Sequence, residues 1–244
     1  MIRVLVNEGQ IADARRSLSR AGCDTSRGWR RFRYALLFAL RFRAWPEPVA
    51  VNKSWDVWNI LQAVRQFVPE PTASIFEMGS YNSEISLALW QAGYRRIRAA
   101  DLNPIGRSIR WYGNGIDFRT EDFYAPDLTA GSVGLMTALS AIEHGYDQER
   151  LLATAQCLLA PGGVLCLTTD YREEKLPVPD DFRPFGQTYR VFSRDEIESL
   201  VAEAGRRGLD LLGDAHWERS DYPIEWLGRR YTFLFLALRK RPLR

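Results

Sequence analysis

From residue 74 onward the chain alternates short apolar runs with amphipathic segments, and this pattern limits the fold more than any other feature. Short apolar runs bounded by turns are typical of strands buried on both faces, and parallel strands need crossover helices between them. We therefore expect a doubly wound α/β fold with a mostly parallel seven-stranded sheet, helices on both faces and an antiparallel last strand. The expected strands are Ser74–Met78, Ile97–Asp101, Ile116–Arg119, Gly134–Leu139, Val164–Thr169, Leu209–Leu212 and Tyr231–Leu238.

Helical periodicity marks the segments between these strands and three segments before them. Apolar residues from Trp55 to Val64 recur at spacings of three or four, as on the buried side of a helix. Ser193 and Glu196 form a capping-box pattern that opens a helix running through Ala204. The other expected helices are Ile11–Ser19, Arg30–Phe42, Trp55–Phe67, Glu84–Ala92, Ile105–Tyr112 and Gln148–Leu159, the last closed by a turn at Pro161, Gly162 and Gly163.

The first 54 residues precede the alternating pattern and are strongly basic. Residues 1–50 hold ten arginines against four acids, in a chain of 244 residues whose formal net charge is only +3. We expect residues 1–54 to be a basic helical N-terminal extension, and residues 55–244 to form the main domain. Such an extension can attract nucleic acid, anionic lipid headgroups or a phosphorylated substrate, or it can be a solvated helix face.

Several classes of protein are disfavoured. Three widely spaced cysteines suit neither a disulfide framework nor a zinc cluster, and two histidines argue against a metal site built on imidazoles. We expect no metal, although carboxylate-bound magnesium stays open. The chain shows no apolar stretch long enough to cross a bilayer and no secretory leader, so we expect a cytoplasmic protein.

Polar and small residues follow the expected strands at the edge where doubly wound sheets bind their ligands. Glu77 and Gly79 end the first strand, and Gly79 lets the backbone approach a ligand closely. Asp101 ends the second strand, 24 residues after Glu77, where a carboxylate can accept both hydroxyls of a ribose. Asp122 and Phe123 follow the third strand and suit the amine and the face of a purine. Taken singly, Gly79 is more typical of a turn, Asp101 can simply cap the turn that follows it, and Asp122 is as typical of an ordinary loop.

In this order the segments resemble the class I S-adenosylmethionine-dependent methyltransferases, which have a Rossmann-like fold. The family's first loop reads as an acidic residue followed by glycines at alternate positions. Glu77 and Gly79 match it, whereas Tyr81 and Ser83 stand where glycine is common. The resemblance covers roughly Trp55 to Lys240 and implies S-adenosylmethionine as cofactor and S-adenosylhomocysteine as product.

The resemblance also implies roles for individual residues. Glu77 would orient the loop and the methionine end of the cofactor, Asp101 the ribose and Asp122 the adenine amine. The family's fourth-strand segment resembles Ser132–His144, and its fifth resembles Leu158–Thr169. The implied cofactor-binding residues are Glu77, Gly79, Ser80, Tyr81, Asp101, Leu102, Asp122, Phe123, Leu139 and Ser140.

His144 is the candidate general base, because it follows the fourth strand and an imidazole has a pKa near neutrality. We expect O-methylation of a small-molecule or saccharide-type acceptor. The acceptor is expected to contact the insertion that follows the fifth strand, with Tyr171 and Arg172 as binding residues. The basic extension would serve as a lid favouring an anionic acceptor, with peripheral contact to an anionic membrane as a further possibility.

Other functions remain open with less support. A non-catalytic Rossmann-like binding module is compatible with Tyr81 and Ser83, and an RNA methyltransferase with the arginines of the extension. A nicotinamide-dependent oxidoreductase is disfavoured, because residues 79–84 do not meet the glycine fingerprint. Nucleic acid is not the acceptor that we expect, because Ser140 is followed by Ala141 and Ile142, where methyltransferases of the adenine amine usually carry two prolines and an aromatic residue.

Overall fold

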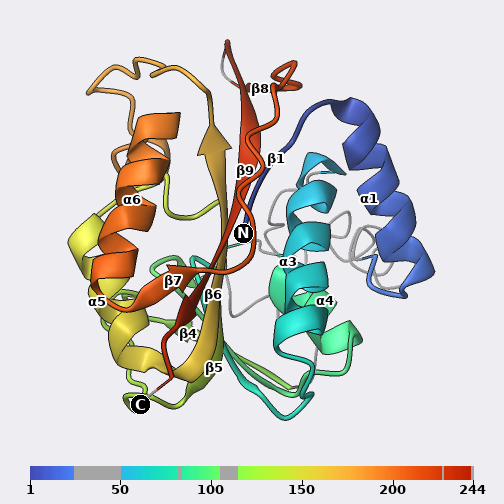
Figure 1. The fold of residues 1–244 in the computed structure, drawn as a ribbon, viewed down its shortest axis with the longest axis vertical. Coiled ribbons are helices and arrows are strands. Elements are labelled where there is room, and N and C mark those ends of the chain that lie inside the picture. Colours follow the sequence, from blue (N-terminus) through green and yellow to red (C-terminus); the bar gives the residue numbers. More distant parts are fainter. Residues whose placement is uncertain (25–50, 82–83, 105–114, 227, 243–244) are drawn as a thin grey trace.

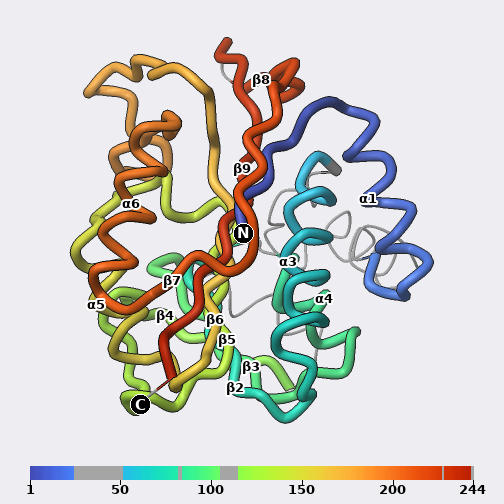
Figure 2. Tube along the Cα trace, viewed as in Figure 1, coloured from blue at the N-terminus to red at the C-terminus, as the bar shows by residue number. Residues whose placement is uncertain are grey.

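The computed structural model of the chain describes residues 1–24, 51–81, 84–104, 115–226 and 228–242. A twisted sheet forms the middle of the molecule, and helices cover both of its faces (Figure 1; Figure 2). The five parallel strands at its centre confirm the expected alternation. They are β2 (Ser74–Met78), β3 (Arg96–Asp101), β4 (Ile116–Thr120), β5 (Val133–Leu139) and β6 (Leu159–Tyr171).

The long strand β9 (Arg229–Lys240) runs antiparallel to β6, as expected for the last strand, and three short strands share its outer edge. β8 (Ile224–Trp226), β1 (Ile2–Val4) and β7 (Leu209–Leu211) pair in turn with residues 229–231, 234–236 and 238–240 of β9. The described residues therefore form a nine-stranded sheet, whereas seven strands were predicted. The strands β1 and β8 were not predicted; each has three residues, so alternation is weak evidence there, and β7, which is as short, was predicted within a longer apolar run.

The strand order is β1-β9-β6-β5-β2-β3-β4 among the described strands. β2 pairs with β3 on one side and with β5 on the other. The chain therefore runs from β2 to β3 and β4 on one side, and then crosses back over the sheet to place β5 on the other side of β2. Such a reversal opens a crevice between the loops that follow the two strands. The carboxyl ends of β2, β3 and β5 are therefore the place to look for a site.

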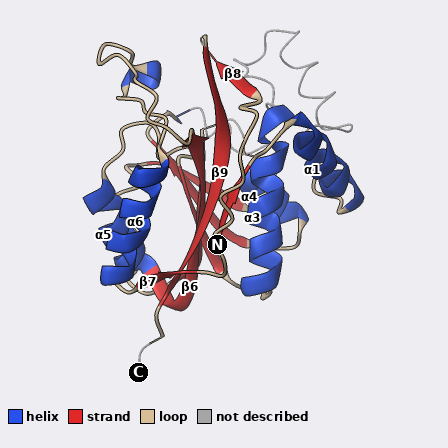
Figure 3. Cartoon of the chain, turned by 45° about the horizontal axis from the view of Figure 1, so that its top comes forward, coloured by secondary structure: helices blue, strands red, loops and turns tan. Residues whose placement is uncertain are grey.

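Helices lie on both faces of the sheet (Figure 3). α3 (Ser54–Phe67) and α4 (Ile85–Gln91) cover one face, with α1 (Glu8–Arg20) packed outside α3, while α5 (Gln148–Leu158) and α6 (Arg194–Arg206) cover the other (Figure 1). The predicted capping box is confirmed, because the Ser193 hydroxyl accepts from Glu196 N and the Glu196 carboxylate accepts from Ser193 N. The described helices, α1 included, confirm the periodicity, and none of them is long and apolar enough to cross a bilayer.

Two parts of the sequence prediction lie outside the described residues. The helices expected at Arg30–Phe42 and Ile105–Tyr112 fall there, and so do residues 25–50 of the basic extension. The described beginning of that extension is built into the main fold, since β1 joins the sheet and α1 packs on α3.

The turn expected at Pro161, Gly162 and Gly163 is corrected by the structure, because these residues lie inside β6. The register against β5 shifts between the pairs Val133–Leu159 and Leu135–Val164, so the strand bulges there. A Cβ at position 163 would lie 2.9 Å from the Ala160 carbonyl oxygen and 3.0 Å from that of Val133. Gly163 thus serves a close approach of two strands, whereas Gly162 provides a φ of +79° within the bulge, after α5 has ended at Leu158.

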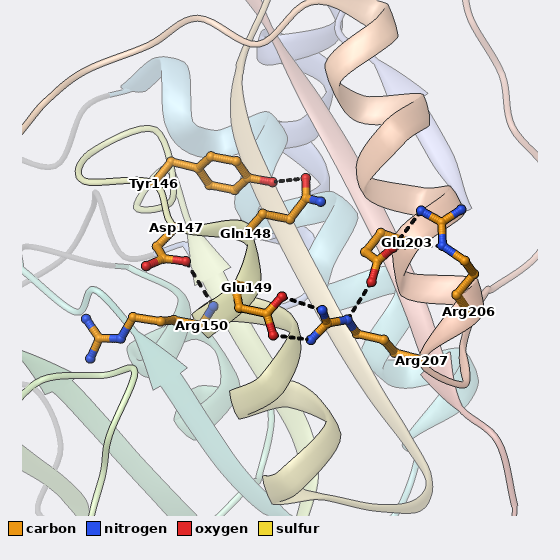
Figure 4. Close-up of polar contacts among 8 residues, drawn as sticks. All are labelled: Tyr146, Asp147, Gln148, Glu149, Arg150, Glu203, Arg206 and Arg207. Atoms are coloured by element: carbon orange, nitrogen blue, oxygen red, sulfur yellow. Dashed lines mark hydrogen bonds and ion pairs between the residues drawn. The ribbon is translucent and has the colours of Figure 1, made fainter.

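Charged side chains join α5 to α6 at the surface (Figure 4). Asp147 caps α5 by accepting from Arg150 N at 3.0 Å. Glu149, in the first turn of α5, forms a two-point ion pair with Arg207 at the end of α6, with 2.8 Å between Oε1 and Nη1. The Arg207 guanidinium also donates to Glu203 at 2.7 Å. These contacts hold the start of α5, and hence the segment leading into it from β5, against α6.

Candidate active site

The loop after β2 is fixed by a glycine and by hydrogen bonds to β3. Gly79 has a φ of +71°, and a Cβ at this position would lie 2.4 Å from the Cβ of Ala141, in the segment after β5. The N–H groups of Gly79 and Ser80 both donate to the Ala100 carbonyl of β3 at 3.0 Å. Only glycine lets this loop adopt its backbone conformation and pack so closely against the segment after β5.

Asp101 ties the loop after β2 to the end of β3. Its carboxylate accepts from Tyr81 N at 2.8 Å and from Asn103 N at 2.7 Å. Burial raises the pKa of Asp101, and these two hydrogen bonds oppose the rise. A carboxylate offers about four acceptor positions, so positions remain for the hydroxyls of a ligand. Tyr81 supports the loop through its N–H group, and a glycine is not required there because its φ is not positive.

Glu77 supports the same loop from beneath. Its side chain is fully buried and accepts a hydrogen bond from the Ser86 hydroxyl of α4. Ser80 and Leu139 are buried as well, whereas the Leu102 side chain is 59% exposed. The predicted cofactor residues at the ends of β2, β3 and β5 therefore range from fully buried to exposed.

Asp122 and Phe123 point in different directions. The ring of Phe123 lies beside Gly79, 3.9 Å from the position that a Cβ would take there. The Asp122 carboxylate accepts from Tyr124 N at 2.9 Å and from the Arg150 guanidinium at 2.6 Å. Burial raises the pKa of Asp122, but these two contacts outweigh it and the pKa is lowered. The structure brings Phe123 to the loop after β2 and turns Asp122 toward α5.

The segment after β5 makes a sharp turn. Ser140 has a φ of +46°, in the left-handed region that residues other than glycine rarely adopt. Its N–H group donates to the Thr168 carbonyl of β6 at 3.1 Å. The turn brings Ala141 against the loop after β2, and the backbone N–H of His144 donates to the Ala141 carbonyl at 3.2 Å. Local strain of this kind is common where a fold positions functional groups.

His144 lies between two aromatic rings. Its ring centre is 5.2 Å from that of Phe185 and 5.2 Å from that of Tyr189. Within the described residues its Nδ1 atom is buried and has no hydrogen-bond partner. Burial and then the charge of Lys53 lower the pKa of His144 to about 4. The imidazole is therefore uncharged near neutral pH, and at this pKa it is a weaker base than an imidazole in water.

One ammonium group and three carboxyl groups meet between α3, β5 and β6, and we call these four residues the Lys53 cluster. Lys53, the residue before α3, donates to the Ser140 hydroxyl, and its Nζ lies 3.8 Å from Asp170 Oδ1. Asp56 lies in the first turn of α3, Glu143 follows β5 and Asp170 lies in β6. None of the three acids is more than 4% exposed. Buried charges of this density are costly unless they are paired.

Hydroxyl groups satisfy part of the Lys53 cluster. The Tyr189 hydroxyl donates to Asp170 Oδ2 at 2.6 Å, and the Tyr231 hydroxyl forms a second hydrogen bond to the same carboxylate. Thr169 donates to Glu143 Oε2 at 3.1 Å. The best-satisfied acid is thus Asp170, which faces two phenols and the ammonium group.

Burial raises the pKa of every acid in the Lys53 cluster, and the charge of Lys53 opposes the rise in each case. The pKa of Asp56 is raised to about 6, and that of Glu143 lies well above its ordinary value because Asp170 adds a like charge. A single ammonium group cannot neutralise three buried carboxylates. The three acids therefore hold their protons more tightly than they would in water.

The two residues expected to bind the acceptor lie away from His144. Tyr171 is buried against the α6 side of the sheet, and its hydroxyl donates to Glu173 at 2.8 Å. The Arg172 guanidinium lies 4.6 Å from the centre of the Tyr222 ring. Both residues line a cavity of about 730 Å³ that His144 does not line. The structure does not bring the predicted acceptor residues together with the predicted base.

The Lys53 cluster was missed by the sequence analysis. Its members come from separate parts of the chain, and only their fold brings them together. One signal was available, because Asp56 follows the apolar Trp55 within the buried stripe of a helix. Asp170, likewise, directly follows an apolar strand and two threonines. Among the described residues, no group of three or more His, Cys, Asp or Glu side chains is arranged to hold a metal ion.

Solved structures with the same architecture are numerous, while no protein-family model and no curated protein sequence matches the chain significantly. The [4+2]-cyclase SpnF has a TM-score of 0.61 and 17% identity over 80% of this chain and 84% of its own. A SAM-dependent methyltransferase from Methanosarcina mazei has a TM-score of 0.56 and 13% identity, over 74% and 97% of the two chains. The 1,6-didemethyltoxoflavin-N1-methyltransferase of Burkholderia thailandensis has a TM-score of 0.54 and 15% identity, over 86% of this chain and 90% of its own.

These likenesses show the fold. The chain has the mixed, mostly parallel α/β fold of the class I S-adenosylmethionine-dependent methyltransferases, as the sequence resemblance implied. SpnF shares this fold and is a cyclase, so the reaction has to be argued from the site.

Proposed function

We propose that this chain is an S-adenosylmethionine-dependent methyltransferase acting on an oxygen of a small-molecule or saccharide-type acceptor. The observation that carries the proposal is the meeting of Gly79, Asp101 and the segment 140–144 at the carboxyl ends of β2, β3 and β5. Doubly wound sheets bind their ligands at this edge. The Burkholderia neighbour, bound to 1,6-didemethyltoxoflavin and S-adenosylhomocysteine, is a methyltransferase of the same fold with a small-molecule substrate.

The groups at this edge fit the parts of the cofactor. The free acceptor positions of Asp101 suit two ribose hydroxyls, and the Gly79 backbone allows close approach. Leu102 and Phe123 offer apolar contact to an adenine ring. When bound, S-adenosylmethionine supplies a methyl group on a positively charged sulfur. The residues proposed to hold it are Glu77, Gly79, Ser80, Tyr81, Asp101, Leu102, Asp122, Phe123, Leu139 and Ser140.

His144 is the proposed proton acceptor. In an O-methylation the acceptor hydroxyl loses its proton, and the uncharged imidazole of His144 would be the group that takes it. The protein otherwise aligns the two reactants and excludes water. We expect His144→Ala to lower turnover by about 100-fold and to leave cofactor binding intact. Unchanged turnover would remove His144 from the mechanism.

Calorimetric titration tests the donor site. The purified chain is titrated with S-adenosylmethionine and S-adenosylhomocysteine, and with NADH as a control. We expect micromolar binding of both adenosyl compounds and none of NADH. Failure of both adenosyl compounds to bind would contradict the proposal.

Two variants localise the binding. Asp101→Asn weakens the acceptor group that faces the ribose, and we expect about tenfold weaker binding or more. Asp210→Asn is the matched control, because Asp210 is exposed, pairs with Arg241 and lies on the short edge strand β7. Equal affinity of the two variants would place the cofactor elsewhere.

A second candidate function is a binding module that keeps the fold without methyl transfer. It is favoured by Asp122, because the hydrogen bond from the Arg150 guanidinium turns its carboxylate toward α5 and away from Phe123 and the loop after β2. Binding of S-adenosylhomocysteine without turnover on any hydroxyl acceptor would support this alternative.

A further inference from the structure

Phe185 is an exposed aromatic residue at the candidate active site. Within the described parts of the chain, Leu102 and Phe185 are the two large apolar side chains that stay exposed, at 59% and 67%. Leu102 directly follows Asp101, and the ring centre of Phe185 lies 5.2 Å from that of His144 and 5.9 Å from that of Tyr81. Single exposed apolar residues are ordinary, but two beside one site are typical of a surface that binds a ligand.

The backbone of Phe185 is strained as well. The residue lies in the single turn Pro184–Gly186 with a φ of +58°, in a region that bulky side chains rarely adopt. A glycine at this position would avoid both the strain and the exposure of an apolar ring. Folding alone therefore does not favour phenylalanine here, and strain of this kind is often kept for a function.

Backbone hydrogen bonds hold the segment that follows this turn against the segment that carries the candidate base. The N–H group of Gly145 donates to the Thr188 carbonyl at 2.8 Å, and that of Arg190 donates to the Glu143 carbonyl at 3.0 Å. The two hydrogen bonds lie on either side of His144 in the sequence. They fix the segment that presents the exposed ring beside the imidazole.

The cavity of about 730 Å³ that His144 does not line offers a different kind of surface. Its charged lining residues are Arg172, Glu173, Glu174, Glu218, Arg219 and Asp221. Charged groups suit a ligand rich in hydroxyls or charges, whereas the rings around His144 suit the face or edge of another ring. Of the two surfaces, the aromatic one lies beside the candidate base.

We propose that Phe185 is an acceptor-binding residue and that the acceptor presents an aromatic ring to it. This proposal rests on the proposed function and names one class among its small-molecule acceptors. The hydroxyl that loses its proton is then phenolic and lies near His144.

The acidity of such a hydroxyl agrees with the candidate base. Burial and the charge of Lys53 lower the pKa of His144 to about 4, so its imidazole is a weak base. A phenolic hydroxyl, such as that of tyrosine, has a pKa of about 10, and an alcohol is a weaker acid still. A weak base is therefore better matched to a phenol than to a sugar hydroxyl.

Nuclear magnetic resonance titration with two probes tests the proposal. The full chain is titrated with 2-naphthol, and separately with methyl β-glucoside as the saccharide probe, both alone and saturated with S-adenosylhomocysteine. We expect 2-naphthol to shift the ring-proton signals of His144 and the glucoside to leave them unchanged. His216, the second of the two histidines, is exposed and serves as the reference, and His216→Gln assigns the signals. A shift with the glucoside but none with 2-naphthol would contradict the proposal.

Three variants localise the aromatic probe. We expect Phe185→Ala to weaken 2-naphthol binding about tenfold, and Phe185→Trp, which keeps an aromatic face, to retain it. Tyr222→Ala is the matched control, because Tyr222 is also aromatic, has a φ of +52° and lines the other cavity. We expect this variant to bind like the unsubstituted chain. If Phe185→Ala binds equally well, or Tyr222→Ala alone weakens binding, the proposal is wrong.

Thermal unfolding separates binding from a structural role. Because the ring is exposed and the φ is positive, we expect Phe185→Gly to keep or raise the Tm while it weakens 2-naphthol binding as Phe185→Ala does. A lower Tm with unchanged binding would show that the ring serves the fold, and would overturn the proposal.

The titration with 2-naphthol needs no methyl donor, so its outcome is distinguishable from that of the calorimetric test. Binding that depends on Phe185, without any binding of adenosyl compounds, would support the aromatic-ligand site and contradict the proposed methyl transfer. Binding of adenosyl compounds, with no binding of 2-naphthol to either form of the chain, would contradict the aromatic-ligand site alone.

Discussion

The loop after β2 and the Lys53 cluster lie at the same edge of the sheet, yet they are stabilised in opposite ways. The loop is held by backbone N–H groups that donate to Ala100 and Asp101, and by the one glycine that its path requires. The cluster is a balance of charges removed from water, in which each acid depends on Lys53 and on the hydroxyls around it. We therefore expect substitution to destabilise the loop mainly at Gly79, and to destabilise the Lys53 cluster at any of its four residues.

The largest expected effect is on the cluster. Asp170→Ala leaves Lys53 without its nearest carboxylate and two tyrosine hydroxyls without their acceptor. Breaking a buried pair in this way costs about 3–5 kcal/mol of the free energy of unfolding. Urea denaturation measures the loss, and Asp210→Ala, which breaks the exposed pair with Arg241, is the matched control. Similar losses in the two variants would mean that the cluster is not held by its charges.

The next effect tests the loop. Gly79→Ala places a Cβ 2.4 Å from that of Ala141 at a φ of +71°, whereas Gly131→Ala meets a similar φ of +67° with no atom within 4 Å. We expect Gly131→Ala to cost about 1 kcal/mol from backbone strain alone. Gly79→Ala is expected to cost a further 1–3 kcal/mol or so from the clash and to weaken binding of S-adenosylhomocysteine. Denaturation measures the loss of stability and calorimetry measures the loss of binding. Equal losses of stability in Gly79→Ala and Gly131→Ala would show that the loop shifts enough to accommodate the added methyl group.

The smallest effect is the pH dependence of stability. Asp56 holds its proton more tightly when folded, so its contribution is complete below its ordinary pKa of 3.8 and is lost as the pH rises through about 6. His144 behaves in the opposite way, because its contribution is complete above its ordinary pKa of 6.5 and is lost as the pH falls through about 4. Between about pH 4 and pH 6, the contribution of Asp56 to the free energy of unfolding falls as the pH rises, whereas that of His144 increases.

We therefore expect Asp56→Asn to make the free energy of unfolding rise more steeply from pH 4 to pH 6. His144→Gln should make it rise less steeply, or fall. Each change over this range is at most about 3 kcal/mol, since one pKa unit corresponds to about 1.4 kcal/mol. Urea denaturation at several pH values measures the slopes. Parallel curves for both variants and the unsubstituted chain would contradict these assignments.

The same contrast explains what the sequence could predict. The five central strands and the residues Gly79 and Asp101 were predictable, because each depends on a local pattern followed by a strand end. Gly79 and Asp101 make contacts between loops that follow neighbouring strands. The fold class implies the order of these strands, so the contacts could be expected as well. Tyr81, which departs from the resembled motif, needed the structure, because its contribution comes from a backbone N–H group.

The Lys53 cluster could not be predicted in this way. Lys53 and Asp170 are far apart in sequence, and no local pattern marks a charge that is balanced elsewhere. The position of the acceptor residues was uncertain for a simpler reason. Neighbouring residues of a strand face opposite sides, so Asp170 points to Lys53 while Tyr171 points to the α6 side. A strand predicted to stop at Thr169 gave no basis for choosing between them.

The shared outer edge of β9 has a consequence for how the chain is made. The residues of β1 are synthesised about 230 positions before their partners in β9, residues 234–236. A contact that spans almost the whole chain is slow to form, and a nascent chain cannot form it at all. We expect the parallel centre of the sheet to assemble during synthesis, while β1 stays unpaired until β9 has been synthesised. Native structure at this edge is then completed only after β9 has left the ribosome.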